Sequence, residues 1–104
     1  MGNRAIVVFK GDDEISPAIY LHWHGNEVGE WITELAQLMG DRKGDVGYAA
    51  ARFCGICHNH IDGNLSLGLI DDGKRFVDDP KGMSHGDNGV FIVECSNYTF
   101  KQFK

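Results

Sequence analysis

Two apolar runs near the start of the chain predict a pair of neighbouring strands. Residues 3–10 read Asn-Arg-Ala-Ile-Val-Val-Phe-Lys, in which β-branched and aromatic side chains follow one another without polar alternation. That pattern is typical of a strand covered on both faces, so we place it at the centre of a sheet. After a polar turn, apolar and polar side chains alternate along Ile19, Tyr20, Leu21, His22, Trp23 and His24. The alternation predicts a second strand that pairs with the first as a hairpin and carries both histidines on one face.

Two stretches in the middle of the chain have the spacing of amphipathic helices. In the first, apolar residues recur three and four positions apart, at Val28, Trp31, Ile32, Leu35, Leu38 and Met39. Asn26 is the expected amino-terminal cap of this helix, and Gly40 is the expected left-handed residue after its last turn. The second stretch gathers its apolar residues on one side, at Val46, Ala50, Phe53, Cys57 and Ile61. It predicts a helix that is capped by Asp45 and ends at Asp62 and Gly63.

The last third of the chain predicts three more strands. Residues 65–69 alternate leucine with serine and glycine, and apolar runs at 90–95 and 98–103 flank a Ser-Asn turn. Residues 74–89 are so rich in Gly, Asp and Pro that we expect an irregular loop there. The predicted order is β-β-α-α-β-β-β. This order favours an α+β fold, a mainly antiparallel sheet of about five strands with two helices packed on one face.

Size and charge narrow the class of protein. One hundred and four residues at 11.5 kDa form a single domain, residues 1–104. Fifteen acidic residues against ten basic ones give a formal charge of −5, the wrong sign for direct binding to nucleic acid. No apolar run approaches the ~20 residues that cross a bilayer, and no signal-peptide pattern opens the chain. Three cysteines do not suggest a disulfide framework, so we expect a cytoplasmic protein without membrane contact, whose oligomeric state the sequence leaves open.

A cysteine and histidine motif lies in the second predicted helix. The run Cys54-Gly55-Ile56-Cys57-His58 matches the CxxCH pattern of haem c attachment. A haem c protein also needs export, a sixth iron ligand such as Met83 and, in common small cytochromes, a largely helical shell. Because many of the predicted elements are strands, haem c is not expected. Cys54 and His58 also stand one helical turn apart, as a nucleophile and its base would, but no residue that orients the base is recognisable, so we predict no catalytic residue.

Zinc is the alternative cofactor, because cysteine thiolates and histidine imidazoles are its usual ligands. The candidate ligands are His22, His24, Cys54, Cys57 and His60. One helix cannot surround a metal tetrahedrally, so a site on the second helix would need the strand pair His22 and His24 as well. We favour packing instead, since free cysteine is among the most buried residue types and the two histidines suit the boundary of a strand. No cofactor is therefore expected.

Acidic side chains offer the remaining candidate for a functional surface. One cluster lies on the first predicted helix and one in the first hairpin turn: Glu27, Glu30 and Glu34, and Asp12, Asp13 and Glu14. Together they predict an acidic patch for a basic protein partner, and the preferred interpretation is a non-enzymatic protein-binding module. A third class is a small-molecule-binding or hydrolytic domain that uses residues 74–89 as a lid. It predicts a deep pocket beneath that loop.

Five short segments also carry a resemblance to known sequences. They are Asn-Arg-Ala at 3–5, Tyr-Leu-His-Trp-His-Gly at 20–25, Tyr-Ala-Ala-Ala-Arg-Phe at 48–53, Leu-Ser-Leu-Gly at 65–68 and Asp-Asn-Gly-Val at 87–90. Taken together, these segments resemble a family of small uncharacterised proteins from phages, plasmids and bacteria. The resemblance spans most of the chain, defines no catalytic residue, and implies apolar residues at positions 54 and 57 in other members, which makes the CxxCH match accidental. It suggests a mobile-element protein that inhibits a host defence complex by offering acidic surface to a basic, nucleic-acid-binding site.

Overall fold

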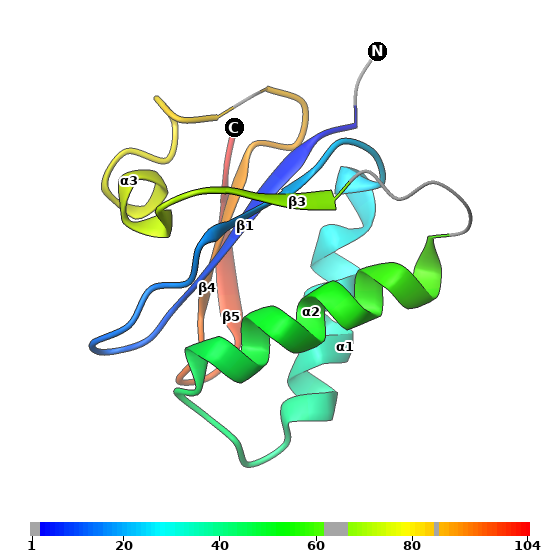
Figure 1. The fold of residues 1–104 in the computed structure, drawn as a ribbon, viewed down its shortest axis with the longest axis vertical. Helices are drawn as coiled ribbons and strands as arrows, with labels where there is room; N and C mark the ends of the chain where they lie inside the picture. The colour runs from blue at the N-terminus through cyan, green and yellow to red at the C-terminus, as the bar shows by residue number, and fades with distance from the viewer. Residues whose placement is uncertain (1–2, 62–66, 85) are drawn as a thin grey trace.

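A five-stranded sheet and three α-helices make up the part of the chain that the computed structural model describes, residues 3–61, 67–84 and 86–104 (Figure 1). In chain order the elements are β1 (Ala5–Lys10), β2 (Ala18–Leu21), a 3₁₀ turn (Gly25–Glu27), α1 (Val28–Met39), α2 (Val46–His60), β3 (Leu67–Asp71), α3 (Gly73–Asp78), β4 (Val90–Glu94) and β5 (Thr99–Phe103). The predicted α+β class with a mostly antiparallel sheet is confirmed. The first two positions of the strand expected over 65–69 lie outside the described residues.

β1 is the central strand, as its unbroken apolar sequence predicts. The strand order is β3-β2-β1-β4-β5. β1 pairs antiparallel with β2 and parallel with β4, and the outer pairs are antiparallel. The parallel register sets Ile6 opposite Val90 and Lys10 opposite Glu94. Residues that precede β1 and residues that precede β4 therefore lie side by side, although more than 80 positions separate Ile6 from Val90 in the chain.

The two faces of the sheet are covered unequally. Alternate residues of β1, ending at Phe9, face a large core built with α1 and α2, where the Phe9 and Phe53 rings meet edge to face at a centroid distance of 5.5 Å. Ile6 and Val8 face a small core that Phe76 of α3 closes. Figure 1 shows α3 apart from the α1 and α2 pair. The predicted packing of two helices on one face is confirmed, and α3 covers part of the other face.

α3 occupies residues that were expected to be an irregular loop, so that prediction is wrong for 74–78. The Asp72 carboxylate accepts a hydrogen bond from the Lys74 backbone N–H at 3.1 Å and caps the helix. Phe76 anchors it with 1% of its surface exposed. A Cβ on Gly73 would lie 1.9 Å from the Ser16 carbonyl oxygen, so only glycine lets the helix begin this close to the segment before β2. A six-residue helix with one fully buried anchor has too weak a periodicity to stand out among turn residues.

β2 is shorter than predicted, and its two histidines do not share a strand face. The strand ends before His22, and His24 adopts the left-handed conformation with φ 69°. The Gly25 N–H donates to the Asn3 carbonyl at 2.7 Å, and the Asn26 N–H donates to the Asn3 side chain at 3.0 Å. Asn26 therefore fastens the turn to the start of β1 and does not cap α1, which corrects that prediction.

The remaining helix ends follow the sequence pattern. Gly40 ends α1 with φ 55°. Asp45 caps α2 by accepting the Tyr48 N–H at 3.2 Å. α2 ends at His60, and the stop expected at 62–63 lies outside the described residues.

Candidate functional site

α1 turns its acidic residues outward, as its amphipathic pattern predicts. Trp31 and Leu35 are buried against the large core. Glu30 is exposed, and Glu27 and Glu34 are half-buried at the rim of the helix. Glu27 is the last residue of the 3₁₀ turn and stands at the N-cap of α1, and Glu30 lies in the first turn, where the positive end of the helix dipole stabilises negative charge. The helix can therefore hold three carboxylates near one another at low cost to the fold.

Charge is distributed very unevenly along the chain around this helix. Residues 11–41 contain seven of the fifteen acidic residues and none of the ten lysines and arginines. The other residues carry the remaining acids and every lysine and arginine, so they are slightly positive. The absence of lysine and arginine over this stretch is a sequence signal for an acidic surface that the position of single glutamates does not reveal.

Two of the three glutamates, Glu27 and Glu34, have histidines as their ionic partners. His24 Nδ1 lies 2.8 Å from Glu27 Oε2, and His60 Nε2 lies 2.8 Å from Glu34 Oε1. Glu30 has no ion-pair partner among the described residues. Elsewhere, carboxylates pair with arginine or lysine, in Arg4–Asp87, Lys10–Glu94, Arg42–Asp45 and Lys74–Asp78. Imidazole is charged only when protonated, so these contacts do not give the glutamates the permanent positive partner that arginine or lysine gives the other carboxylates.

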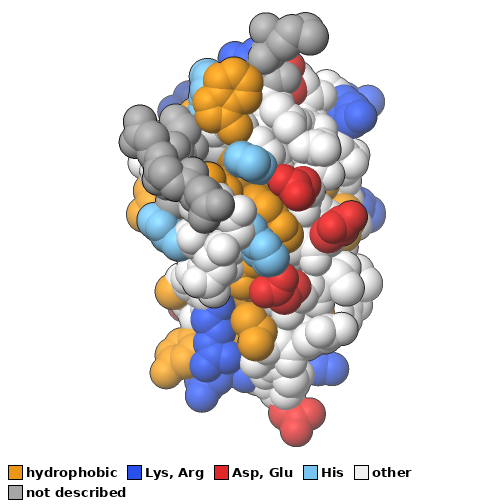
Figure 2. Space-filling view, turned by 90° about the vertical axis from the view of Figure 1, so that its right-hand side faces the viewer, with side chains coloured by type: hydrophobic (Ala, Val, Ile, Leu, Met, Phe, Trp, Pro, Cys, Tyr) orange, Lys and Arg blue, Asp and Glu red, His pale blue; other side chains and the backbone are white. Residues whose placement is uncertain are grey.

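Both histidines also cover the indole of Trp31. The His60 ring stacks on Trp31 at 5.4 Å between centroids and 8° between planes, and the His24 ring stacks at 6.2 Å and 28°. Trp31 is only 4% exposed, whereas Trp23 in the preceding loop is 49% exposed. Figure 2 shows histidine and acidic side chains gathered beside hydrophobic surface on this side of the molecule. We call this surface the acidic–aromatic face and define it by Trp23, His24, Glu27, Glu30, Trp31, Glu34 and His60.

The acidic residues of the first hairpin turn do not join this face. Asp12, Asp13 and Glu14 are exposed in the turn that follows β1. The acidic–aromatic face begins at Gly25, which binds Asn3 before the opposite, amino end of β1. Figure 1 shows the β1–β2 turn well away from the start of α1. The sequence predicts one acidic patch, and the structure places its two halves at opposite ends of the central strand.

The cysteines lie in or at the edge of the large core. Cys57 and Cys95 are fully buried, and Cys54 is half-buried against the same core. Burial raises the pKa of Cys54, and it raises the pKa of Cys57 to about 12 and that of Cys95 to about 11. A thiol held in its protonated form is a poor nucleophile and a poor metal ligand. The predicted packing role of these residues fits their environment.

The five alternative zinc ligands are not brought together. Within the described ranges, no three His, Cys, Asp or Glu side chains are grouped so that they could hold a metal ion. His22 Nδ1 instead lies 2.9 Å from the Tyr20 hydroxyl, and His24 and His60 contact glutamates. Cys54 and Cys57 point to the core.

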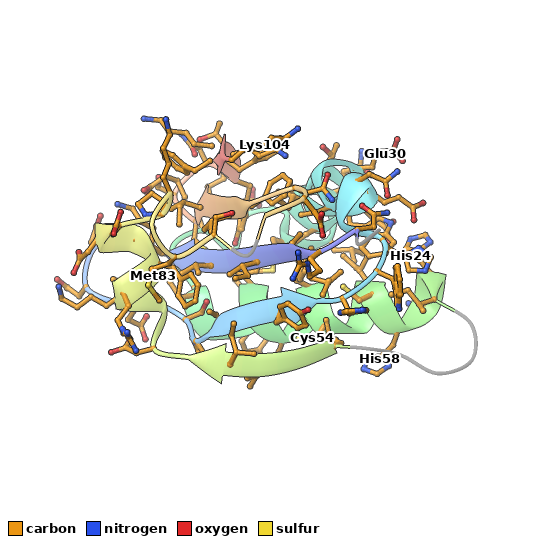
Figure 3. The ribbon with its side chains drawn as sticks, turned by 90° about the horizontal axis from the view of Figure 1, so that it is seen from above. His24, Glu30, Cys54, His58, Met83 and Lys104 are labelled. Carbon is orange, nitrogen blue, oxygen red and sulfur yellow. The ribbon has the colours of Figure 1, made fainter. Side chains whose placement is uncertain are left out.

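The residues considered for haem c are also separated. Met83 packs on the small core beneath α3, whereas Cys57 belongs to the large core on the other face of the sheet. Figure 3 shows Met83 beside α3 and His58 at the far end of the same view. Met83 therefore does not approach the histidine of the CxxCH motif.

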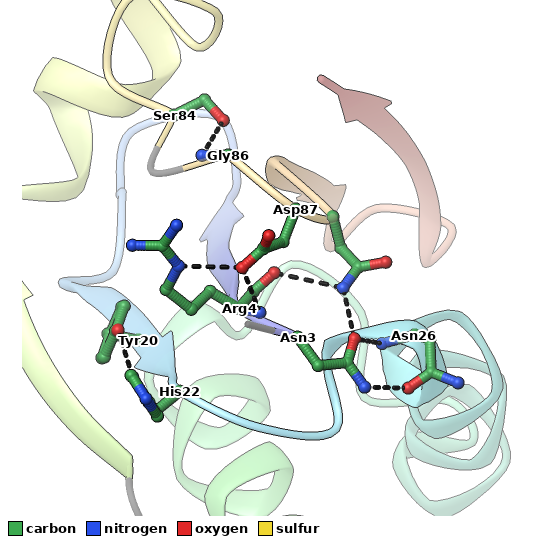
Figure 4. Close-up of polar contacts among 9 residues, drawn as sticks. Asn3, Arg4, Tyr20, His22, Asn26, Ser84, Gly86 and Asp87 are labelled. Atoms are coloured by element: carbon green, nitrogen blue, oxygen red, sulfur yellow. Dashed lines mark hydrogen bonds and ion pairs between the residues drawn. The ribbon is translucent and has the colours of Figure 1, made fainter. Parts of the chain in front are cut away.

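A polar network at the amino ends of β1 and β4 is the second dense cluster of functional groups (Figure 4). The Asn88 side chain donates to Asn3 Oδ1 at 2.6 Å and to the Arg4 carbonyl at 3.2 Å. The Asn3 side chain in turn donates to Asn26 Oδ1. Asp87 Oδ2 accepts from Arg4 Nε at 2.8 Å and from the Arg4 backbone N–H at 3.1 Å. Sequence reasoning missed this cluster because only the parallel pairing of β1 with β4 creates it.

Gly25 fits tightly into the same network. A Cβ at this position would lie 2.6 Å from both the Asn3 carbonyl oxygen and Asn88 Nδ2. Only glycine can therefore pass between these groups without displacing them. Three of the five segments that carry the resemblance, 3–5, 20–25 and 87–90, thus meet at one place in the structure.

A cavity of about 250 Å³ lies beside the segment that was expected to act as a lid. Val77 and Pro80 of that segment line it together with Ile92, Lys101 and Phe103 of the sheet. Binding sites for small molecules usually measure about 300–1,000 Å³. The cavity is thus a small one, formed where α3 leaves the β4 and β5 half of the sheet face uncovered.

Comparison of the chain with protein-family models, with curated proteins and with solved structures gave no match. In the described part of the chain, none of the helices has the length and apolar character that crossing a membrane requires.

Proposed function

We propose that this protein is a non-enzymatic binding module whose acidic–aromatic face docks on a basic surface of another protein. The observation that carries the proposal is the uncompensated charge of α1. Glu27, Glu30 and Glu34 lie in a stretch without lysine or arginine. Glu27 and Glu34 contact histidines, and Glu30 has no ion-pair partner among the described residues. Carboxylates that the fold does not neutralise are available to a cationic partner.

The composition of the face suits protein recognition. Complementary charge raises the rate of encounter and selects the partner, while exposed tryptophan supplies contact area at the centre of many interfaces. Trp23 projects beside His22, with ring centroids 4.6 Å apart and planes at 90°. Glu30 is free of internal pairing among the described residues, so it can bind a partner without first breaking a contact.

The partner that this face fits is a protein with clustered lysine and arginine. Such clusters commonly contact nucleic acid, and an acidic surface competes with nucleic acid for them. The inhibitor of a host defence complex suggested by the resemblance is one specific form of this proposal. It adds the expectation that the bound partner loses affinity for nucleic acid.

Charge reversal on α1 tests the proposal against a matched control. The triple variant Glu27→Lys, Glu30→Lys, Glu34→Lys and the triple variant Asp12→Lys, Asp13→Lys, Glu14→Lys change the formal charge equally, at opposite ends of β1. Both triples and the wild type serve as bait in a host lysate, and each protein recovered is purified for a direct Kd measurement. We expect the α1 triple to bind at least about tenfold more weakly and the hairpin triple to bind nearly as the wild type does.

Circular dichroism shows whether the α1 triple is folded, and each of its three charge changes is expected to alter the stability by about 0.5 kcal/mol. A folded α1 triple that keeps every wild-type partner at unchanged Kd would show that α1 is not the docking surface. Equal loss in both triples would mean that net charge alone governs binding, and would equally contradict the proposal.

A further inference from the structure

The guanidinium of Arg4 is held in one orientation on the face of the sheet opposite α1. Asp87 Oδ2 accepts hydrogen bonds from Arg4 Nε–H at 2.8 Å and from the Arg4 backbone N–H at 3.1 Å. Figure 4 shows the two terminal nitrogens of Arg4 turned away from Asp87. The carboxylate therefore occupies one edge of the guanidinium and leaves the terminal amino groups pointing elsewhere. Hydrogen bonds to Arg4 lower the pKa of Asp87, so the pair stays ionised.

The loop that presents Asp87 is itself fixed. Asp87 has φ 54°, a left-handed conformation that is uncommon outside glycine, and Gly86 before it has φ 84°. The Gly86 N–H donates to Ser84 Oγ at 3.0 Å, and the Asn88 N–H donates to the Arg4 carbonyl at 3.0 Å. A strained backbone conformation persists only where several surrounding contacts hold it, and such positions cluster at binding sites. The network thus holds Arg4 and the loop beside it in place.

Two further polar side chains continue the row from Arg4 along β2. Hydrogen bonds with Asp87 and, to a lesser extent, with the Tyr20 hydroxyl raise the pKa of the Arg4 guanidinium. The Tyr20 hydroxyl lies 2.9 Å from His22 Nδ1. Tyr20 faces the small core, because it pairs with Ile6 across the β1–β2 ladder. Arg4 is 38% exposed, and Tyr20 and His22 are half-buried, so solvent reaches the row.

We propose that Arg4, Tyr20 and His22 form a binding site for a phosphate-type oxyanion, such as the phosphate group of a phosphate monoester. The planar fork of arginine matches two oxygens of phosphate at once. Because Tyr20 and His22 are hydrogen-bonded to each other, the pair keeps one further donor for the anion, either the tyrosine O–H or the outer imidazole N–H. That donor comes from another direction than the arginine fork, which suits a tetrahedral anion better than a planar carboxylate. Asp87 faces the site from the loop before β4 and balances the charge of Arg4. The orientation of the donors therefore supplies the selectivity.

Arg4 and Tyr20 lie apart from the docking surface proposed above. Tyr20 belongs to the α3 side of the sheet, whereas α1 packs on the other side. His22 contacts Trp23 of the acidic–aromatic face, so the variants at Arg4 and Tyr20 are the ones that separate the two activities.

Titration of the ¹⁵N-labelled protein with inorganic phosphate and then with phenyl phosphate tests the site by NMR. We expect saturable shifts of the backbone amides of Arg4, Tyr20 and residues 86–88, with a Kd of about 1 mM or below for phenyl phosphate. Arg4→Gln is expected to weaken binding at least about tenfold, and Tyr20→Phe and His22→Gln about threefold each. Arg4→Lys keeps the charge but loses the fork, so it is expected to bind nearly as weakly as Arg4→Gln.

Arg42→Gln is the matched control, because Arg42 also forms a partly exposed ion pair with an aspartate, Asp45, at 3.1 Å. This variant is expected to bind phosphate like the wild type. Shifts that do not saturate by about 20 mM would overturn the proposal, as would equal weakening in Arg42→Gln or acetate binding as tightly as phosphate. If Arg4→Gln does not fold, unchanged binding in both Tyr20→Phe and His22→Gln overturns it as well.

Discussion

The two faces of the sheet differ in how much they bury and in what they leave exposed. On one face, α1 and α2, with 12 and 15 residues, close a large core and turn acidic side chains outward. On the other, the six-residue α3 covers a few side chains and leaves Arg4, Tyr20 and His22 within reach of solvent. The face covered by α1 and α2 therefore supplies most of the stability. On the other face, the short α3 leaves polar groups of the sheet accessible to a ligand.

Truncation of one phenylalanine in each core is the strongest way to test this division. Phe53 is completely buried in the large core, and Phe76 is 1% exposed in the small one. Phe53→Ala is expected to lower the free energy of unfolding by about 4 kcal/mol, because it leaves a cavity among long helices that cannot collapse. Phe76→Ala is expected to cost about 3 kcal/mol or less, since a six-residue helix can shift to fill the space.

Urea denaturation measures both changes, and hydrogen exchange separates them further. Phe76→Ala is expected to release protection in α3 while the strands keep theirs, and Phe53→Ala is expected to lower protection throughout. A larger loss of stability in Phe76→Ala than in Phe53→Ala would contradict the expectation that the large core supplies most of the stability.

Neutral replacement of two histidines tests the contrast from the acidic side. His24 and His60 contact the carboxylates of Glu27 and Glu34 at 2.8 Å, so a basic partner has to compete with them for these carboxylates. The double variant His24→Gln, His60→Gln is expected to bind the partner about three- to tenfold more tightly than the wild type. His58→Gln is the control, since His58 is exposed on α2 and forms no ion pair with a described residue. Unchanged affinity in the double variant would remove the histidines from the mechanism.

Titration of the thiols of the large core gives a further test. Burial raises the pKa of Cys57 from 9.0 to about 12 and that of Cys95 from 9.0 to about 11. Their contribution to stability is fully present below pH 9.0, and it is lost as pH rises through the raised values, because the unfolded chain releases these protons first. Urea denaturation at increasing pH above 9 should show a falling free energy of unfolding, with a shallower fall in Cys57→Ala. An equally steep fall in that variant would contradict the assignment to Cys57.

The sequence predicted elements well wherever the apolar periodicity is long. β1, α1, α2 and the closing hairpin follow from runs whose burial is repeated over several turns or strand positions. The sequence pattern does not predict α3, because a single buried phenylalanine, Phe76, anchors this helix. The alternation predicts a longer strand than β2, because the contacts that end the strand, from Gly25 and Asn26 to Asn3, are tertiary.

The candidate sites show the same limit more sharply. The outward glutamates of α1 could be predicted from helical spacing, and the lack of lysine and arginine across 11–41 could have strengthened that prediction. The network around Arg4 could not, because Arg4 and Asp87 meet only through the parallel pairing of β1 with β4. No local pattern encodes which strand lies beside which.

The parallel pairing of β1 with β4 also affects the order in which the sheet can form. β2 follows β1 after a short turn, but the other neighbour of β1, β4, follows only after β2, all three helices and β3. Until β4 arrives, one hydrogen-bonding edge of the most apolar strand stays open to other chains. Contacts between such distant positions slow folding, so we expect the rate-limiting step to be the insertion of the β4–β5 hairpin beside β1.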